Sequence, residues 1–432
     1  MEKFVIQGGT PLSGEIIAAG NKNAALPILS ACLLTDEELV LVNVPRIRDT
    51  ETQVALLEQL GVKVEWEADR LRLQADTVSE TAPDEHLAAR IRASFLLAGP
   101  LLARFGQARM PPPGGDFIGR RRLDPHLDAF RDMGARVEGD REVEITVPES
   151  GLRPCAIFMD EPSVMATENA LMAAALTPGP TTISNAACEP HVQDLARLLV
   201  KMGAQIDGIG SNVMTVHGRD RLSGAEHRVC PDHIEVASFM ALAAASRGEL
   251  RIRDAQPEDL VTIRRQFRRL GLESRIEGPD VVVPPDQTLE IQDDLGDAIP
   301  KIDDGPWPAF PADLTSIALA LATQARGTIL IFEKMFENRL FFVDKLVAMG
   351  ARITLCDPHR AIVSGPSRLH GERLESPDIR AGMAMLIAAL CAAGASEIGN
   401  VVQIDRGYER IDDRLRDLGA RIERVSAERV PA

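Results

Sequence analysis

Apolar residues recur at helical spacing in six similar segments of the chain, and each segment ends in a glycine. A glycine in this place is typical of a helix C-terminus, because glycine adopts left-handed backbone angles at little cost. The residues after these glycines mostly alternate between apolar and polar, which predicts a strand. The glycines are 68 to 79 residues apart, so one kind of unit is repeated six times. They are Gly61, Gly134, Gly203, Gly271, Gly350 and Gly419.

Each unit also contains a second segment that is apolar almost all round, which predicts a buried helix. A short run rich in apolar and β-branched residues follows it and predicts a strand, as at residues 39–44, 181–184 and 328–332. We therefore expect mixed α/β units with helices inside and sheets outside, grouped as two domains of three units. The buried helices are expected at residues 23–34, 92–104, 163–176, 235–247, 313–326 and 378–393.

Polar side chains collect at the first turns of these buried helices. Helix N-termini present unpaired backbone N–H groups and the positive end of the helix dipole, so six of them facing one cleft would form an anion site. The alternative role is N-capping, which we favour for Ser163 and Thr167. The other residues at these turns are Lys22, Asn23, Arg92, Glu235, Asp313, Asp378 and Arg380.

Composition narrows the class of protein. The chain has 432 residues, enough for two domains, and its 64 acidic against 48 basic residues disfavour nucleic acid and anionic membranes as partners. Its six cysteines lie far apart and its eight histidines show no ligand spacing, so we expect reduced thiols and no metal. Neither a signal peptide nor an apolar run of membrane-spanning length is visible, which favours the cytoplasm.

One loop stands out between the predicted elements. Residues 111–122 begin with three prolines and contain Gly114, Gly115 and Gly119, followed by three consecutive arginines. Glycines beside a stiff proline run predict a mobile lid, and the crowded arginines indicate a bound anion. Asp116 lies at the tip of this lid. The alternative is an ordinary surface connection.

Five separated motifs, which start at Ala19, Pro113, Pro308, Phe336 and Ile404, are together typical of one known family. The chain resembles the UDP-N-acetylglucosamine 1-carboxyvinyltransferases from Lys3 to about Glu423. The resemblance implies an α/β fold of the enolpyruvyl transferase type, a two-domain inside-out α/β barrel with six βαβαββ-like repeats, three per domain. One domain would span residues 22–230, the other residues 1–21 plus 231–432, with the active site in the cleft between them.

The resemblance also implies a reaction and its residues. The sugar 3'-hydroxyl adds to phosphoenolpyruvate, and phosphate then leaves a tetrahedral intermediate, without metal or cofactor. Asp313 would be the base, and Lys22, Arg121, Arg380 and Arg406 would hold phosphoenolpyruvate. The structural alternatives are an N-cap for Asp313 and surface ion pairs for the arginines. Further substrate contacts would come from Asn23, Arg92, Arg122, Leu123, Asp124, Pro125, Ser163, Val164 and Met335, with Glu337 and Asp378 as supporting carboxylates.

Four positions depart from the pattern of many relatives. Many relatives have proline where this chain has Arg122, and a residue other than proline where it has Pro125. They have lysine or arginine in place of Glu161, and arginine in place of His233. These changes lie near the expected uridine and diphosphate contacts.

The fifth departure is Asp116, where most relatives have cysteine. An acid that donates a proton must hold one at the working pH, and an ordinary aspartate does not at pH 7. We therefore expect a rate optimum at lower pH if Asp116 is the donor; the alternative is a role in product release. We also expect insensitivity to fosfomycin, an epoxide that alkylates the cysteine of relatives, because a carboxylate is a poorer nucleophile than a thiolate.

Two other functions remain open from the sequence. The first is the shikimate-pathway enolpyruvyl transferase, which usually has Lys-Ser where this chain has Lys22-Asn23 and lacks this kind of lid. The second is a regulatory paralogue that binds nucleotide sugar without catalysis, suggested by Glu161, Pro125 and His233. The sequence assigns no oligomeric state.

Overall fold

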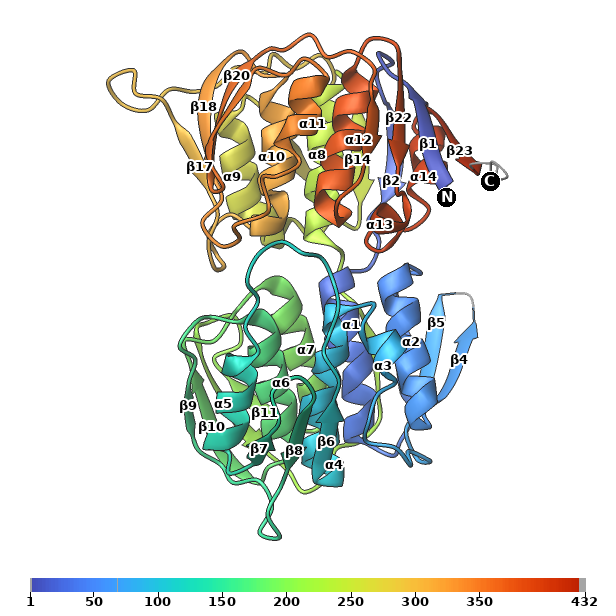
Figure 1. Ribbon diagram of the computed structural model, residues 1–432, viewed down its shortest axis with the longest axis vertical. Coiled ribbons are helices and arrows are strands. Elements are labelled where there is room, and N and C mark those ends of the chain that lie inside the picture. The colour runs from blue at the N-terminus through green and yellow to red at the C-terminus, as the bar shows by residue number, and fades with distance from the viewer. Residues whose placement is uncertain (1, 68, 427–432) are drawn as a thin grey trace. The chain divides into compact units, whose positions relative to one another are not determined.

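The computed structural model describes residues 2–67 and 69–426, which form two compact units (Figure 1). The terminal unit comprises residues 1–19, 117–120 and 231–432. The central unit comprises residues 20–116 and 121–230. The chain therefore passes between the units after Ala19 and after Cys230, and the loop segment 117–120 groups with the terminal unit.

Buried helices form the core of the central unit. Helix α1 contains Pro27 and tightens into a 3-10 turn, and a 3-10 turn also precedes α4. Almost every side chain of α1 and α6 is buried, as the apolar pattern predicted. The inner helices are α1 (Lys22–Ser30) with η1 (Ala31–Leu34), η2 (Arg92–Leu97) with α4 (Ala98–Phe105), and α6 (Val164–Ala175); the others are α2 (Arg48–Leu60), α3 (Glu85–Ala88), α5 (Asp124–Asp132) and α7 (Pro190–Lys201).

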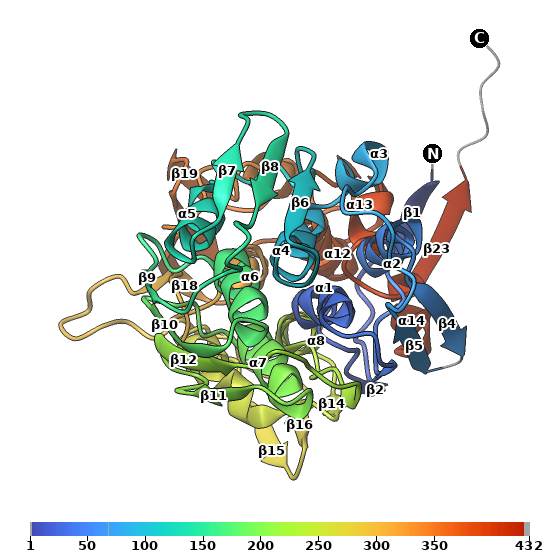
Figure 2. The same ribbon diagram turned by 90° about the horizontal axis from the view of Figure 1, so that it is seen from below.

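Three sheets surround these helices (Figure 2). Each four-stranded sheet joins one parallel strand to three antiparallel strands, and β13, from the end of the unit, pairs in parallel with β3 near its start. The third sheet has three strands within the described residues. The sheets are β13 (Ala225–Arg228), β3 (Leu39–Val42), β5 (Arg70–Gln74), β4 (Lys63–Glu67); β11 (Gln205–Asp207), β12 (Val213–Gly218), β10 (Gly179–Ser184), β9 (Ala156–Phe158); and β6 (Gln107–Met110), β8 (Val143–Thr146), β7 (Arg136–Glu138).

The terminal unit repeats this plan around three helices that pack on one another, α8, α10 and α12. All residues of α8 and α10 are buried. Its inner helices are α8 (His233–Ala245), η4 (Ala312–Leu314) with α10 (Thr315–Ala322), and α12 (Ile379–Cys391); the others are η3 (Pro257–Leu260), α9 (Val261–Arg269), α11 (Val343–Ala348), α13 (Val402–Asp405) and α14 (Ile411–Asp417).

The N-terminal strands complete two of the three sheets of the terminal unit. Strand β1 lies between β22 and β23, and β2 pairs in parallel with β14, so residues far apart in sequence share one sheet. The sheets are β21 (Arg373–Glu375), β22 (Ala395–Gly399), β1 (Glu2–Gln7), β23 (Arg421–Ser426); β15 (Arg275–Glu277), β16 (Asp280–Val283), β14 (Leu250–Arg253), β2 (Gly14–Ile17); and β17 (Lys301–Asp303), β18 (Gly327–Phe332), β20 (Arg360–Gly365), β19 (Ile353–Asp357).

The six repeat glycines end six helices in the same way. All have positive φ angles, between 81° and 113°. At Gly134, for example, the glycine N–H donates to the carbonyl of Arg131, and the next N–H, of Ala135, donates to that of Phe130. These two bonds satisfy carbonyls at the end of α5 that have no partner within the helix. The prediction of six helix–glycine–strand units is confirmed.

Candidate active site

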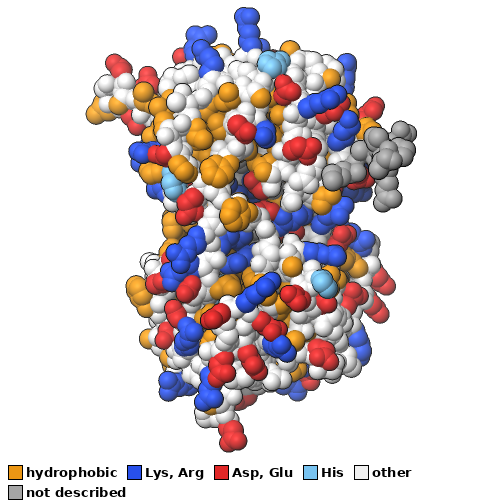
Figure 3. Space-filling model, viewed as in Figure 1, with side chains coloured by type: hydrophobic (Ala, Val, Ile, Leu, Met, Phe, Trp, Pro, Cys, Tyr) orange, Lys and Arg blue, Asp and Glu red, His pale blue; other side chains and the backbone are white. Residues whose placement is uncertain are grey.

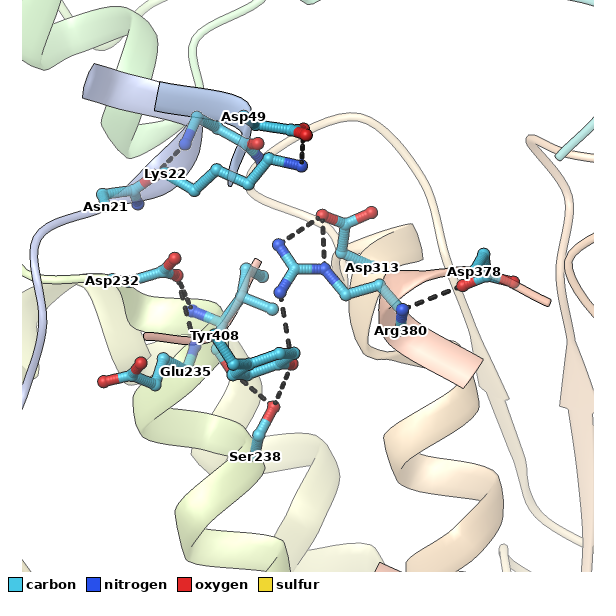
Figure 4. A network of polar contacts seen from close by, with 12 residues as sticks. Asn21, Lys22, Asp49, Asp232, Glu235, Ser238, Asp313, Asp378, Arg380 and Tyr408 are labelled. Atoms are coloured by element: carbon cyan, nitrogen blue, oxygen red, sulfur yellow. Dashed lines mark hydrogen bonds and ion pairs between the residues drawn. The ribbon is translucent and has the colours of Figure 1, made fainter. Parts of the chain in front are cut away.

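A carboxylate held by two buried arginines is the main feature of the terminal unit. Figure 4 shows its contact with one of them, Arg380. Asp313, in the short η4 turn, accepts from Arg339 Nη2 at Oδ1 (2.7 Å) and from Arg380 Nε at Oδ2 (3.1 Å). Both guanidinium side chains are 4% exposed, whereas the Asp313 side chain is 26% exposed. Because each carboxylate oxygen can accept more than one bond, Asp313 can also receive a substrate hydroxyl.

The charges of this cluster support one another. Burial alone would lower the pKa of Arg380, but the charge of Asp313 and the hydroxyl of Tyr408 outweigh burial and raise it. Burial likewise opposes the charge of Arg339, and Asp313 and Asp378 outweigh it and raise that pKa. Both guanidiniums therefore stay charged at the base of the site.

Arg380 is held at its backbone and at its side chain. Asp378 caps helix α12, where Oδ1 accepts the N–H groups of Arg380 (2.8 Å) and Ala381 (2.9 Å). At the far end, Arg380 Nη1 donates to the hydroxyl of Tyr408 (3.2 Å), which lies 3.1 Å from Ser238 Oγ. The expected Asp378 acts here as a helix cap that fixes Arg380.

Two buried carboxyls brace the segment that carries Met335. Asp304 accepts the N–H groups of Lys334 and Met335, and Glu333 accepts that of Phe336 at 3.1 Å. Burial, reinforced by the charge of Asp304, raises the pKa of Glu333 to about 8. Glu333 therefore holds a proton at neutral pH.

The loop tip 117–120 lies on Glu337 within the terminal unit. Glu337 Oε2 accepts the N–H of Arg120 at 3.2 Å, and the carbonyl of Ile118 accepts the N–H of Asn338 at 3.0 Å. Backbone N–H groups, its own and that of Arg120, lower the pKa of Glu337. At Gly119, with φ of 140°, a Cβ atom would lie 2.2 Å from Glu337 Oε2. Only glycine fits this contact without a shift.

In the central unit, Lys22 begins helix α1 and is 9% exposed. Its ammonium pairs with Asp49 Oδ2 at 2.8 Å. Asn21 caps the helix, since its side chain accepts from the N–H groups of Asn23 (2.9 Å) and Ala24 (3.1 Å). Lys22 is thus a buried cation whose place is set by a capped helix end and one carboxylate.

Arg92 connects the two ends of the loop 111–122 in the central unit. Its Nη2 donates to the carbonyl of Arg121 (2.7 Å), and a Cβ atom on Gly115 would lie 2.9 Å from Arg92 Cβ. Burial, with a smaller effect of Arg121, lowers the pKa of Arg92 to about 10. Half-buried Asp116 lies between these two ends. Arg92 therefore positions the loop, whatever it contributes to substrate binding.

The residues after the loop begin helix α5. Arg122 Nη1 lies 2.7 Å from Asp160 and 3.8 Å from Glu161, and its Nε donates to Asp124 at 3.3 Å. The hydrogen bond to Asp160, outweighing burial, raises the pKa of Arg122. The acid at position 161 thus faces an arginine at position 122. Leu123 is the N-cap residue of this helix, and Pro125 stands in its first turn.

Ser163 and Val164 mark the start of helix α6. Ser163 Oγ accepts the N–H of Ala166 at 3.4 Å, which agrees with the expected N-cap. Thr167 is not a cap, because its hydroxyl donates to the carbonyl of Ser163 and accepts the N–H of Ala187. The N-cap residue of α10 is Leu314 and not Asp313.

Arg406 lies in the terminal unit at the end of α13, with Nη1 bonded to Gln403 at 2.8 Å. The expected residues therefore fall into two sets. The terminal set is Asp313, Met335, Glu337, Asp378, Arg380 and Arg406. The central set is Lys22, Asn23, Arg92, Asp116, Arg121, Arg122, Leu123, Asp124, Pro125, Ser163 and Val164. Their assembly into one site, and the domain limits of 22–230 and 1–21 plus 231–432, stay predictions.

The contacts of three residues of the site were not predicted from the sequence. Arg339 lies in the Phe336 motif, so its presence there was the available signal. Tyr408 likewise lies in the motif that starts at Ile404, whereas Asp49 has no such signal and meets Lys22 only in the folded chain. Tyr408 is the only tyrosine of the chain.

Acidic and basic side chains are intermixed on the visible surface of each unit (Figure 3). The net charge of −16 is therefore not concentrated in one patch of that face. Among residues 2–67 and 69–426, no helix is long and apolar enough to cross a membrane. The same residues contain no cluster of histidine, cysteine and carboxylate side chains suited to a metal ion.

Comparison with known proteins defines the class. The family of EPSP synthase (3-phosphoshikimate 1-carboxyvinyltransferase) matches residues 6–415. The chain belongs to this family of enolpyruvyl transferases. In fold it is similar to the enolpyruvyl transferase NikO from Streptomyces tendae (TM-score 0.88, 24% identity, 99% of each chain). It is also similar to an EPSP synthase from Acinetobacter baumannii (TM-score 0.76, 17% identity, 99% of this chain and 100% of that one). The expected fold is confirmed.

Curated relatives narrow the resemblance. The chain is 57% identical to a protein of Bradyrhizobium diazoefficiens over 98% of both chains. It is 54% identical to one of Treponema denticola, over 98% of this chain and 99% of that protein. Both relatives are named UDP-N-acetylglucosamine 1-carboxyvinyltransferase. The resemblance found in the sequence is confirmed.

Proposed function

We propose that this protein transfers the enolpyruvyl group of phosphoenolpyruvate to the 3'-hydroxyl of UDP-N-acetylglucosamine and releases phosphate. The relatives that are 46–57% identical over nearly their whole length carry that activity in their name. The reaction is the first committed step of peptidoglycan synthesis, and we place it in the cytoplasm. The single structural observation that carries the proposal is the partly exposed Asp313 held between buried Arg339 and Arg380.

Asp313 takes the proton of the sugar hydroxyl in this proposal. Its two arginines fix both carboxylate oxygens, so the base is oriented before the substrate arrives. As the hydroxyl oxygen attacks C2 of phosphoenolpyruvate, the methylene carbon gains a proton, and a tetrahedral phospho-ketal forms. Loss of a proton from the resulting methyl group, together with loss of phosphate from C2, then gives the enolpyruvyl ether.

The cations hold the dense negative charge of phosphoenolpyruvate. Lys22, Arg121, Arg380 and Arg406 are the proposed ligands of its phosphate and carboxylate. Arginine suits this role because its planar fork matches both groups. Stabilising the charge that develops on the intermediate is the largest single contribution that such a site makes.

Asp116 is the proposed proton donor to the methylene carbon, and product release is its alternative role. Asp116 lies between Gly115, which packs against Arg92, and residues 117–120, which contact Glu337. A movement of the loop would therefore move Asp116. Arg121 to Pro125, with Asn23, Arg92, Ser163, Val164 and Met335, are the proposed contacts of the nucleotide sugar. Glu337 and Asp378 support them through the loop and through Arg380.

The alternative acceptor of the enolpyruvyl group is 3-phosphoshikimate, after which the matching family is named. The EPSP synthase structures are only 17% identical to the chain and share its fold, while its 46–57% identical relatives are named for the nucleotide sugar. The regulatory paralogue has no supporting observation in the arrangement around Asp313.

Product identification tests the proposal. The purified protein is incubated with phosphoenolpyruvate and UDP-N-acetylglucosamine, and the nucleotide sugar is analysed by mass spectrometry. We expect the mass of an enolpyruvyl ether, and none with the Asp313→Asn variant. Tight binding of the nucleotide sugar without any product at pH 5 to 9 would support the regulatory reading instead.

A further inference from the structure

The two crossings of the chain are tied together in the central unit. The backbone N–H of Asn21, on the first crossing, donates to the carbonyl of Cys230, on the second, at 2.7 Å. The N–H of Cys230 in turn donates to Asp194 Oδ2 at 2.9 Å. The other oxygen, Oδ1, lies 3.1 Å from His227 Nε2. One carboxylate on helix α7 therefore holds the second crossing, which holds the first.

This carboxylate and its partners are almost completely buried. Asp194 is 3% exposed, His227 4%, Cys230 7% and Asn21 1%. A hydrogen bond to a buried charged acceptor is about twice as strong as a neutral one, and removing the acceptor leaves a buried N–H without a partner. The position of Cys230 thus depends strongly on Asp194.

The network leads directly to Lys22. Asn21 is both the residue that donates to Cys230 and the side chain that caps α1, and Lys22 is the first residue of that helix. A shift of Asn21 moves the start of the helix, and with it the ammonium that pairs with Asp49. Helix caps fix the direction in which the chain enters a helix.

We propose that Asp194 is a positioning residue for the reaction, which fixes Cys230 and, through the Cys230–Asn21 hydrogen bond, the first turn of α1 and the ammonium of Lys22. It touches no substrate. Its effect reaches phosphoenolpyruvate through Lys22, so this part of the inference rests on the proposed function.

The terminal unit contains a similar arrangement, which independently supports the view that buried carboxylates anchor the crossing residues. Here Glu235 Oε1 accepts the N–H of Ala19 at 2.9 Å, and the N–H of Asp232 donates to the carbonyl of Ala19 at 2.8 Å. Arg414 holds both oxygens of Glu235 at 2.8 Å. In each unit, one buried carboxylate thus receives the N–H of a crossing residue.

The test compares two partners of the same network. Asp194→Ala removes the acceptor of Cys230, whereas His227→Phe removes only the second partner of Asp194 and serves as the matched control. We expect both to lower the melting temperature. Only Asp194→Ala should raise the KM for phosphoenolpyruvate, by about tenfold, which is the size of one net hydrogen bond. The kcat should change less than the KM. Asp194→Asn keeps an oxygen for Cys230 and should restore most of the wild-type KM.

Amide hydrogen exchange tests the anchor without reference to activity. In Asp194→Ala, the amides of Asn21 and Cys230 should exchange at least about tenfold faster than in His227→Phe, because their bonds depend on the lost carboxylate. Equal KM values and equal exchange in the two variants would overturn the proposal. If Lys22→Ala leaves the KM for phosphoenolpyruvate unchanged, the proposed role of Lys22 is wrong. The exchange rates of Asn21 and Cys230 still test whether Asp194 fixes the crossings.

Wild-type protein gives a second test should Asp194→Ala not fold. The amides of Asn21 and Cys230 should be strongly protected and should exchange at the same rate, because one opening exposes both. Exchange as fast as in an exposed turn, such as the one at Gly278, would overturn the inference.

Discussion

At the scale of residues, the site is organised by a few charged groups that are held before any substrate is bound. Asp313 gains its orientation from Arg339 and Arg380, and these arginines keep their charge because the carboxylate lies between them. Breaking such a buried cluster leaves a charge without its partner, which costs several kcal/mol. Activity and stability are therefore linked at this position.

Asp313→Asn should lower kcat by about 10²–10⁴, the usual contribution of a general base. Arg339→Lys should lower kcat by about tenfold, because lysine cannot reproduce the planar guanidinium contact. Steady-state rates at 25 °C, on protein shown to be folded by circular dichroism, measure both effects. Arg360→Lys, at an exposed arginine of β20, is the control and should leave the rate unchanged. Wild-type kcat in Asp313→Asn would contradict its role as base.

Asp116→Cys should change both pH dependence and drug sensitivity. If Asp116 donates a proton, the alkaline limb of the wild-type pH–rate profile lies at lower pH than that of the cysteine variant, because a carboxyl loses its proton before a thiol does. The variant should also gain inactivation by fosfomycin, since it presents a thiolate. Identical alkaline limbs would sink the donor assignment. Rapid labelling of the wild-type loop by fosfomycin would sink the expected insensitivity.

The raised pKa of Glu333 predicts that the folded protein loses stability as the pH rises toward 8. Burial raises its pKa to about 8 in the folded protein, above the value of an exposed glutamate. The folded state therefore binds the proton more tightly than the unfolded state, so its stabilising effect is complete below about pH 4 and is lost as pH rises through 8. Between pH 6 and 9 the melting temperature of Glu333→Gln should fall less than that of the wild type. Parallel curves would mean that Glu333 is ionised in both states.

Individual residues were predictable from the sequence where a helix start or a family motif marks them. The capping role of Ser163 follows from its place before α6. Arg339, Asp49 and Asp194 were not predicted as contacts, because their partners are 26, 27 and 36 residues away in sequence. Only the packing of helices determines such pairs.

At the scale of elements, glycines govern where helices end and how closely the loop approaches its neighbours. Gly114 lies so close to the end of α3 that a Cβ atom would be 1.8 Å from the carbonyl of Ala89. Gly119 meets Glu337 in the same way. The glycines of the loop thus allow close contact with neighbouring residues.

Gly119→Ala should impair catalysis. The added methyl group would displace Glu337 Oε2, so the loop tip cannot keep its bonds to residues 337 and 338. We expect kcat/KM for both substrates to fall at least about tenfold, because a small misplacement of a catalytic loop is costly. Gly106→Ala is the control, since Gly106 also has a positive φ (75°) but its Cβ would meet nothing within 4 Å. Equal kcat/KM values in the two variants would contradict the importance of this contact.

Most elements were predictable because their apolar pattern reflects burial. All six inner helices lie where the periodicity predicts them, and so do the six glycines that end the other helix of each repeat. Two details were not predictable. Helices α4 and α10 begin with 3-10 turns, and the sheet of β6, β7 and β8 has three strands among the described residues. Both depend on how neighbouring elements pack, which local pattern does not encode.

At the scale of the whole molecule, the repeats build two similar units from one plan. Strands from the far ends of each unit close its sheets, as β13 does with β3 and β1 does with β22. The crossings at residues 19–21 and 230–232 follow from that closure. Sequence repeats predicted three units per domain, but the anchoring carboxylates Asp194 and Glu235 emerged only in the folded chain.

The central claim is the identity of the acceptor, and phosphate release tests it most directly. Wild-type protein is mixed with phosphoenolpyruvate and either UDP-N-acetylglucosamine or 3-phosphoshikimate, and the phosphate formed is measured over time. We predict release that requires both phosphoenolpyruvate and the nucleotide sugar, and none above background with 3-phosphoshikimate. Release with 3-phosphoshikimate, or release that does not depend on UDP-N-acetylglucosamine, would contradict the account.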